Sequence, residues 1–185
     1  MSARTQSRNF RLRMAVAVAP MAAVLIVAAG IAAAADVGVT AADRDFLNTA
    51  AQGGMMEVAA GKLATQRAMD PDVKAFGKRM VTDHSAANDM LKSLAASKNV
   101  PLPESVSEEE RTALGKLEGL NGTEFDKAYS QMMVKDHVTD VGDFEKEVKN
   151  AKDPDVKSFA QETLPTLRHH LMMANQLSAA EKKSP

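Results

Sequence analysis

The sequence predicts an all-α fold, an up-down-up-down bundle of four long helices with a short extra helix in the crossover between the second and the third. Aromatic residues make up only 4% of the 185 residues and tryptophan is absent, whereas Ala, Met, Lys and Glu, which favour helices, are abundant. No run of alternating β-branched residues is present. Apolar residues recur instead at spacings of three and four over four long stretches, as on the buried face of a helix.

A heptapeptide is repeated almost unchanged later in the chain. Residues 70–76 read DPDVKAF and residues 153–159 read DPDVKSF. An aspartate before a proline predicts a helix start, because the carboxylate caps free N–H groups and proline loses nothing at the first helical position. Such a short connection places the two helices that it joins side by side and antiparallel. The repeat therefore predicts two helical hairpins, with both Asp-Pro turns at the same end of the bundle.

The first hairpin is expected to fill the chain up to about Ser97. Its first helix should run from Thr40 or Asp43 to about Met69, and its second should start at the Asp70 turn. Glycines in the first helix cost about 1 kcal/mol each in helix propensity. They predict a close approach by a neighbouring helix at Gly53, Gly54 and Gly61.

The connector between the hairpins contains about twenty residues, which is too long for a simple bundle turn. Pro101 and Pro103 favour an extended chain, because each proline pushes the preceding residue out of helical geometry. The following segment, Ser107 to Glu110, is a capping box. It predicts a short amphipathic helix that extends through Leu117.

The second hairpin is expected to begin with a helix capped by Thr123 and to continue into a helix that starts at the Asp153 turn. Pro165 falls inside that last helix and should kink it near Gln161. These elements place the bundle at residues 43–178, between a linker at 36–42 and a flexible tail at 179–185.

The first 35 residues differ from the rest and predict export. Four arginines are the only charged residues there, and an apolar run follows from Met14 to Ala35. A basic start, an apolar stretch and a small-residue ending describe a signal peptide that is cut after Ala35. The same run, residues 14–35, is just long enough to be an uncleaved membrane anchor instead. Either way, the domain is expected in the periplasm or cell envelope.

Charge and cysteine content exclude several classes of function. Without residues 1–35 the chain keeps 19 basic and 24 acidic residues, a net charge of −5, which argues against a nucleic-acid partner. Cysteine is absent, so disulfides, zinc–thiolate sites and thiol chemistry are excluded. The sequence contains no recognisable Ser-His-Asp arrangement or phosphate-binding glycine loop, and no catalytic residue is predicted.

Three predicted helices carry one histidine each on the apolar stripe, namely His84, His137 and His170, and the remaining helix has Glu57 near its stripe. Glu57 and His84 lie 13 and 14 residues from the first Asp-Pro turn, and the other two lie 16 and 17 residues from the second. At 1.5 Å per residue these heights differ by roughly 5 Å. The four side chains can therefore form one shared metal site, with Glu57 as the nearest carboxylate.

The neighbours of these histidines leave the choice of metal open between copper, iron, manganese and zinc. Thioethers one turn from each histidine would suit copper(I), and they belong to Met80, Met133 and Met173. Carboxylates could join the histidines around iron or manganese instead, and they belong to Glu57, Asp83, Asp136 and Asp140.

The alternative is that each histidine is a hydrogen-bonded core residue and each methionine fills a packing gap. A ferritin-type di-iron centre fits poorly, because it needs a Glu three residues before a ligand His, where this chain has Val81 and Val134. His169 lies off the stripe and is expected to be exposed.

Segments from all four predicted helices carry a resemblance to a known family: Asp45–Leu47 with Ala50–Glu57, Val73–Gly77 with Asp83-His84, Phe125–Tyr129 with Asp136-His137, and Leu164–Leu171. They resemble a bacterial family of ferritin-like domains of unknown function, whose members are often labelled outer membrane proteins. The similarity covers about residues 40–178. It implies an exported ferritin-like four-helix bundle and a link to envelope stress, but no established reaction.

The sequence thus predicts an exported bundle of undefined activity that binds a metal ion or small ligand through inward-facing His, Glu and Met side chains. A structural or interaction module of the envelope without metal is the alternative. A di-iron oxidoreductase fits least.

Overall fold

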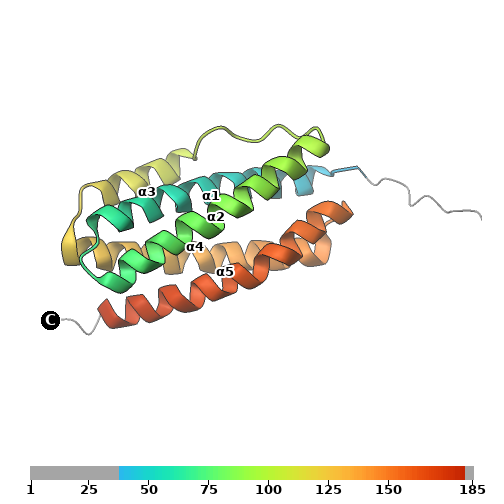
Figure 1. Ribbon diagram of the computed structural model, residues 1–185. Coiled ribbons are helices and arrows are strands. Elements are labelled where there is room, and N and C mark those ends of the chain that lie inside the picture. Colours follow the sequence, from blue (N-terminus) through green and yellow to red (C-terminus); the bar gives the residue numbers. More distant parts are fainter. Residues whose placement is uncertain (1–37, 182–185) are drawn as a thin grey trace, which may run out of the picture. The chain divides into compact units, whose positions relative to one another are not determined.

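The computed structural model describes residues 38–181. This part contains five helices and no strand, which confirms the all-α prediction: α1 Ala41–Arg67, α2 Pro71–Ser97, α3 Glu108–Glu118, α4 Gly122–Asn150 and α5 Pro154–Glu181. The four long helices pack into a bundle, and the short α3 lies in the crossover (Figure 1). Among residues 38–181, none of the helices contains an apolar stretch that could span a lipid bilayer. The predicted leader at 1–35 lies outside the described residues.

Local capping chemistry explains where the helices begin. Thr40 and Asp43 form a capping box at the start of α1, and Ser107 and Glu110 form another at the start of α3. Asp70 accepts hydrogen bonds from the N–H groups of the second and third residues that follow it, and Asp153 does the same at α5. The two copies of the repeat therefore cap their helices alike, as the sequence predicts.

The start of α4 differs from the expectation. Thr123 does not cap this helix, which begins one residue earlier, at Gly122. The preceding residue, Asn121, occupies the N-cap position but makes no capping hydrogen bond through its side chain.

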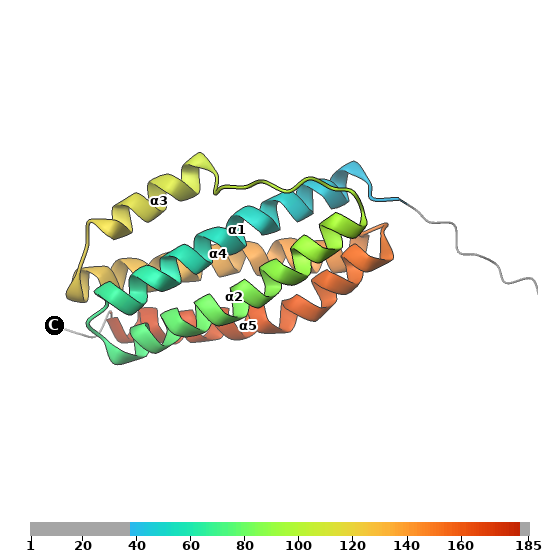
Figure 2. The same ribbon diagram turned by 45° about the horizontal axis from the view of Figure 1, so that its top comes forward.

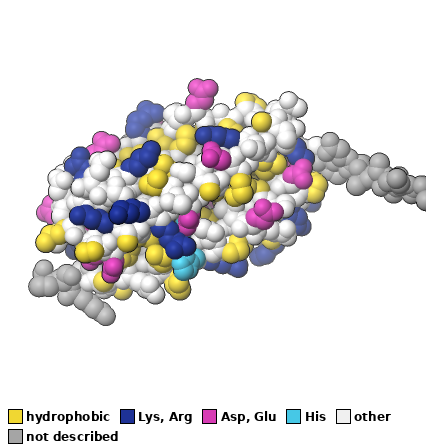
Figure 3. All heavy atoms as spheres, viewed as in Figure 1, with side chains coloured by type: hydrophobic (Ala, Val, Ile, Leu, Met, Phe, Trp, Pro, Cys, Tyr) yellow, Lys and Arg dark blue, Asp and Glu magenta, His cyan; other side chains and the backbone are white. Residues whose placement is uncertain are grey.

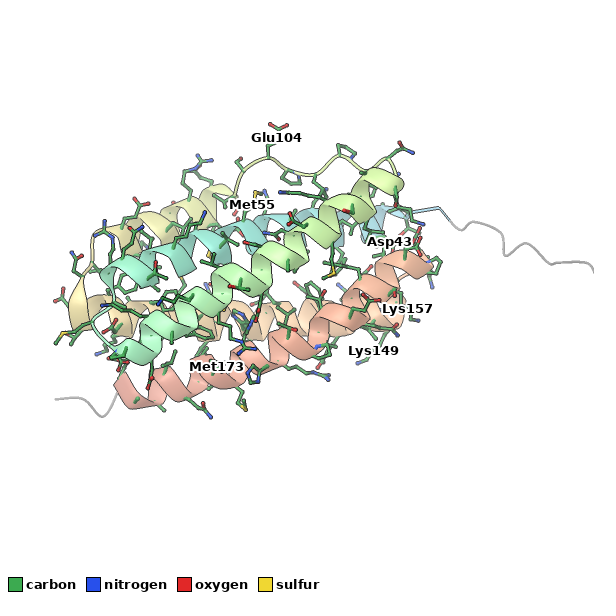
Figure 4. The ribbon with its side chains drawn as sticks, viewed as in Figure 1. Asp43, Met55, Glu104, Lys149, Lys157 and Met173 are labelled. Atoms are coloured by element: carbon green, nitrogen blue, oxygen red, sulfur yellow. The ribbon has the colours of Figure 1, made fainter. Side chains whose placement is uncertain are left out.

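Helix direction is the main correction to the sequence-based prediction. The α1–α2 turn sits against the start of α4, where the Asp126 carboxylate accepts hydrogen bonds from the backbone N–H groups of Met69 and Asp70. At the other end, Asp43 accepts one from the backbone N–H of Lys152 in the α4–α5 turn. Figure 4 shows Asp43 and Lys157 at this same end. The two Asp-Pro turns therefore lie at opposite ends of the bundle, not at one end.

The crossover explains the difference. Helix α2 ends at Ser97, far from the start of α4, so residues 98–121 must run back along the whole bundle before α4 can begin (Figure 2). The packed pairs α1–α2, α1–α4, α2–α5 and α4–α5 are all antiparallel, so direction alternates around the bundle. Along the chain the order is up, down, down, up. A single long crossover of this kind is found in ferritin-like folds.

The apolar core is divided into two clusters. One cluster lies toward the α1–α2 turn and includes Phe76, Phe125 and Tyr129. The other lies toward the α4–α5 turn and includes Phe144 and Phe159. The helix midpoints between them carry buried polar side chains, so a polar layer crosses the centre of the bundle.

Helices α1 and α2 approach closely at Gly61 and Gly77. A Cβ atom on Gly77 would lie 2.6 Å from the Cβ of Ala64 and 2.9 Å from the carbonyl oxygen of Gly61. A Cβ on Gly61 would lie 2.7 Å from the carbonyl oxygen of Gly77. The missing side chains therefore set the spacing of the first hairpin, as predicted for Gly61.

We expect Gly77→Ala to lower the free energy of unfolding by about 1–3 kcal/mol, because the added methyl group forces two backbones apart. Gly142→Ala in α4 is the matched control, since a Cβ there meets nothing within 4 Å. It should raise stability by up to about 1 kcal/mol through helix propensity. Urea denaturation measures both, and equal effects of the two substitutions would contradict the close-contact interpretation.

Two salt bridges join the end of α2 to the start of α5. The Lys98 ammonium lies 2.8 Å from Asp153 Oδ2 and 2.7 Å from Asp155 Oδ2. Burial alone would raise the pKa of Asp153, but the Lys98 ammonium and two backbone N–H groups outweigh it and hold that pKa below its ordinary value of 3.8. The same two carboxylates raise the pKa of Lys98.

Lys98→Met should cost about 2 kcal/mol of stability near neutral pH, because it leaves the buried Asp153 carboxylate without its cation. The depressed pKa of Asp153 means that its contribution is complete above pH 3.8 and is lost as the pH falls through the folded-state value. The difference between wild type and variant in urea melts should therefore narrow in acid. A difference that stays constant down to pH 2 would contradict this assignment.

Candidate metal centre

Each long helix contributes one buried polar side chain near its midpoint. These side chains are Glu57 from α1, His84 from α2, His137 from α4 and His170 from α5, and each is at most 5% exposed. They lie in the polar layer between the two apolar clusters. The structure therefore brings together all four residues that the sequence analysis singled out.

The three histidines converge from three different helices. Their ring centroids are 5.2 Å apart for His84 and His170, 5.4 Å for His137 and His170, and 5.7 Å for His84 and His137. One ring nitrogen from each lies within 4.8 Å of the others. An ion placed among them would be within reach of all three rings after small side-chain movements, since imidazole–metal bonds are about 2.0–2.1 Å.

One nitrogen of each ring is held by an oxygen atom. His84 Nδ1 lies 2.7 Å from Glu57 Oε2, and His170 Nε2 lies 2.8 Å from Asp83 Oδ2. His137 Nδ1 lies 3.0 Å from the backbone carbonyl oxygen of Met133. A carbonyl or carboxylate oxygen accepts, so these three nitrogens carry the protons and donate.

The other nitrogen of each ring is buried and has no hydrogen-bond partner. These atoms are His84 Nε2, His137 Nε2 and His170 Nδ1. With the proton on the opposite nitrogen, each has a free lone pair. Metal-bound histidines show the same division, with one nitrogen on the ion and the other donating to a carboxylate or a backbone carbonyl.

Burial keeps all three imidazoles neutral. It lowers the pKa of His84 to about 4 and that of His137 to about 3, the latter also because His84 and His170 are close. It lowers the pKa of His170 to about 4 despite the hydrogen bond to Asp83. The rings are thus in the form that binds a metal over the whole physiological range of pH.

Carboxylates surround the histidines on two sides. Glu57 also approaches His137, with Oε1 3.3 Å from Nε2, and a carboxyl oxygen of Asp140 lies within 4.8 Å of one of Glu57. Burial raises the pKa of Glu57 well above its ordinary value and, together with the charge of Glu57, raises that of Asp140 to about 9. In both groups burial is the largest cause of the rise in pKa.

The remaining candidates occupy different places. Asp83 is the partner of His170, and Asp136 lies half-buried with a pKa that burial raises to about 6. Met80 and Met133 are fully buried in the first apolar cluster, and Met173 packs against it. The fourth histidine, His169, is exposed as expected. Figure 3 shows that histidine reaches the surface on the face drawn there.

A family model described as a domain of unknown function, DUF4142, matches residues 28–177. The chain belongs to the DUF4142 family. This finding supports the predicted membership of an uncharacterised domain family. No curated protein matches the sequence significantly.

Solved structures share the fold of this DUF4142 protein. A DUF305 fragment from Deinococcus radiodurans superposes with a TM-score of 0.69 at 13% identity, covering 77% of this chain and 99% of the other. A DUF305 protein from Streptomyces coelicolor, described as secreted, gives 0.64 at 18% identity, with 76% and 92% covered. CopM in a Cu(II)-bound form gives 0.64 at 14% identity, with 75% and 96% covered. Identities this low establish a common helical fold and nothing more.

Replacing His170 with Leu tests whether this histidine stabilises the fold as a core residue. Because His170 Nδ1 is buried without a partner, the metal-free variant should lose no more than about 1 kcal/mol of unfolding free energy. Its Asp83 partner is 25% exposed and can turn to water. Denaturation with a chelator present measures this, and a loss of about 3 kcal/mol would identify His170 as a structural core residue.

Proposed function

We propose that this protein is a metal-binding bundle that holds one divalent transition-metal ion on His84, His137 and His170. Two observations support this most directly: each ring has one buried nitrogen without a hydrogen-bond partner, and one nitrogen of each ring lies within 4.8 Å of the others. A structural histidine would satisfy both nitrogens, because an unpaired buried polar atom costs about 1–3 kcal/mol. Three such atoms in one place are better explained by a ligand.

Three imidazoles suit Cu²⁺ or Zn²⁺, whereas Mg²⁺ and Ca²⁺ prefer oxygen ligands. Glu57 lies close enough to supply a fourth donor. The structural neighbour CopM, which was solved with Cu(II) bound, supports copper among the candidates. The thioethers of Met80 and Met133 lie one helical turn from His84 and His137 and could bind copper(I).

The surroundings favour binding or carriage of the ion over catalysis on an organic substrate. The chamber beside the site, which His84 and Glu57 help to line, has a volume of about 30 Å³. That is room for about one or two water molecules. We therefore propose a metal-binding role and no enzymatic one.

We also propose that the protein works outside the cytoplasm, in the periplasm or at the cell envelope. The arginine-rich start and the apolar run to Ala35 support export. The DUF305 neighbour described as secreted is consistent with it.

Protein without a polyhistidine tag should bind one equivalent of Cu²⁺ or Zn²⁺, and either ion at 100 times its dissociation constant should stabilise the fold by about 2.7 kcal/mol. His84→Ala, His137→Ala and His170→Ala should each abolish that stabilisation, because each removes a ligand. Isothermal titration and thermal melts with each ion measure the effect separately.

His169→Ala is the matched control, since this histidine neighbours the site in sequence but is exposed. It should bind metal like the wild type. Equal loss of binding in all four variants would point to a surface site, and no binding by the wild type would leave a structural module of the envelope.

A further inference from the structure

Asp140 connects the histidine trio to a second set of ligands. Together with Glu57 and His137 it forms a group whose donor atoms lie within 4.8 Å of one another. His137 belongs to both groups, and its Nδ1 is held by the Met133 carbonyl, so only Nε2 is left for an ion. The two ligand sets are therefore neighbouring positions for one ion, not sites for two.

The second set borders the small chamber beside the site. Glu57 and Asp140 line this chamber together with Thr163, whose buried hydroxyl has no partner, as is also true of Glu57 Oε1. Gly53 leaves space there, because even a Cβ on it would stay 4.0 Å from Asp140 Oδ1. The chamber thus offers oxygen donors and room for a water molecule that accompanies an ion.

A groove of about 560 Å³ between α1 and α4 lies next to the chamber. Three residues line both the groove and the chamber: Ala50, Asp140 and Phe144. The groove has an excess of acidic side chains, four besides Asp140 against two lysines: Asp43, Asp45, Asp143 and Glu147 against Lys146 and Lys152. Asp140, Asp143 and Glu147 follow one another at spacings of three and four, so they share one face of α4.

We propose that the metal ion reaches the histidine trio through this α1–α4 groove and is held first by Asp140, Glu57 and His137. This inference rests on the proposed metal-binding function. Carboxylates accept a hydrated cation more readily than imidazoles do, and the imidazoles then bind a transition metal more selectively. Asp140 is accordingly a loading residue and not a ligand of the final position.

The seam between α1 and α2 is a less suitable route. Asn88 separates the chamber from a second surface groove there, and it lines both. Its side chain occupies the space above Gly54, where a Cβ would collide with the Asn88 amide. This amide carries no net charge, so the seam attracts a cation less strongly than the carboxylates of the α1–α4 groove do.

The single tyrosine of the chain provides a reporter for loading. Tyr129 lies eight residues before His137 on α4, about 12 Å along the helix, and no tryptophan competes with it. Stopped-flow mixing with Cu²⁺ should therefore quench its fluorescence at the rate at which copper reaches the site. Asp140→Asn removes the carboxylate, and Ala50→Leu narrows the passage while it keeps every ligand.

We expect both variants to load at least about tenfold more slowly than the wild type. In Ala50→Leu the final quenching and the dissociation constant should be unchanged, because a narrower passage slows the entry and the exit of the ion by the same factor. Asp136→Asn is the control for charge. It lies one turn away on α4 but lines neither the groove nor the chamber, and it should load within about twofold of the wild type.

Loading of Asp140→Asn and Ala50→Leu at the wild-type rate would overturn the route. Loss of equilibrium binding in Asp140→Asn alone would overturn the loading role and make Asp140 a ligand of the final position. Failure of the wild type to bind Cu²⁺ at all would instead refute the proposed function, so the two failures are distinguishable.

Discussion

The bundle depends on how it accommodates three buried imidazoles, each of which has one ring nitrogen without a hydrogen-bond partner. Each such atom costs about 1–3 kcal/mol, so the rest of the fold must compensate. Apolar packing does so on either side of the polar layer, in two separate clusters. Buried aspartates fasten the two ends, Asp126 at the α1–α2 turn and Asp153 at the α4–α5 turn. The stabilising contacts thus lie away from the centre. The central layer instead contains buried polar atoms without partners, which is expected at functional sites.

The sequence was sufficient to predict what depends on neighbouring residues. Helix starts at Asp70, Asp153 and Ser107 follow from capping groups within three positions, and they are confirmed. Helix direction depends instead on the path of the crossover, which no local pattern specifies. The inward histidines at similar depth were nevertheless predicted correctly. The four long helices have 27, 27, 29 and 28 residues, and a residue near a helix midpoint keeps its height whichever way the helix runs.

The hydrogen-bond partners of the histidines could not be predicted from spacings in the sequence. Asp83 was a candidate ligand in sequence, but it accepts a hydrogen bond from His170, which is 87 residues away on another helix. The same holds for Asp140, whose contact with Glu57 joins α4 to α1. The structural neighbours cannot supply this information either, because a fold shared at 13–18% identity does not transfer a site. Only the arrangement of this chain's own side chains distinguishes the ring nitrogens without a partner from those that an oxygen atom holds.

Charge balance links the carboxylates to the proposed ion. A divalent cation among three neutral imidazoles would place two positive charges between apolar clusters, which is costly unless anions compensate. Glu57 and Asp83 already face His84 and His170 and can supply that compensation. In the metal-free protein, burial raises the pKa of both Glu57 and Asp140, which favours their uncharged forms and limits repulsion between them. A bound cation would lower the pKa of these carboxyl groups and so favour their charged forms. The same acidic pair could therefore be uncharged without metal and supply negative charge beside a bound ion.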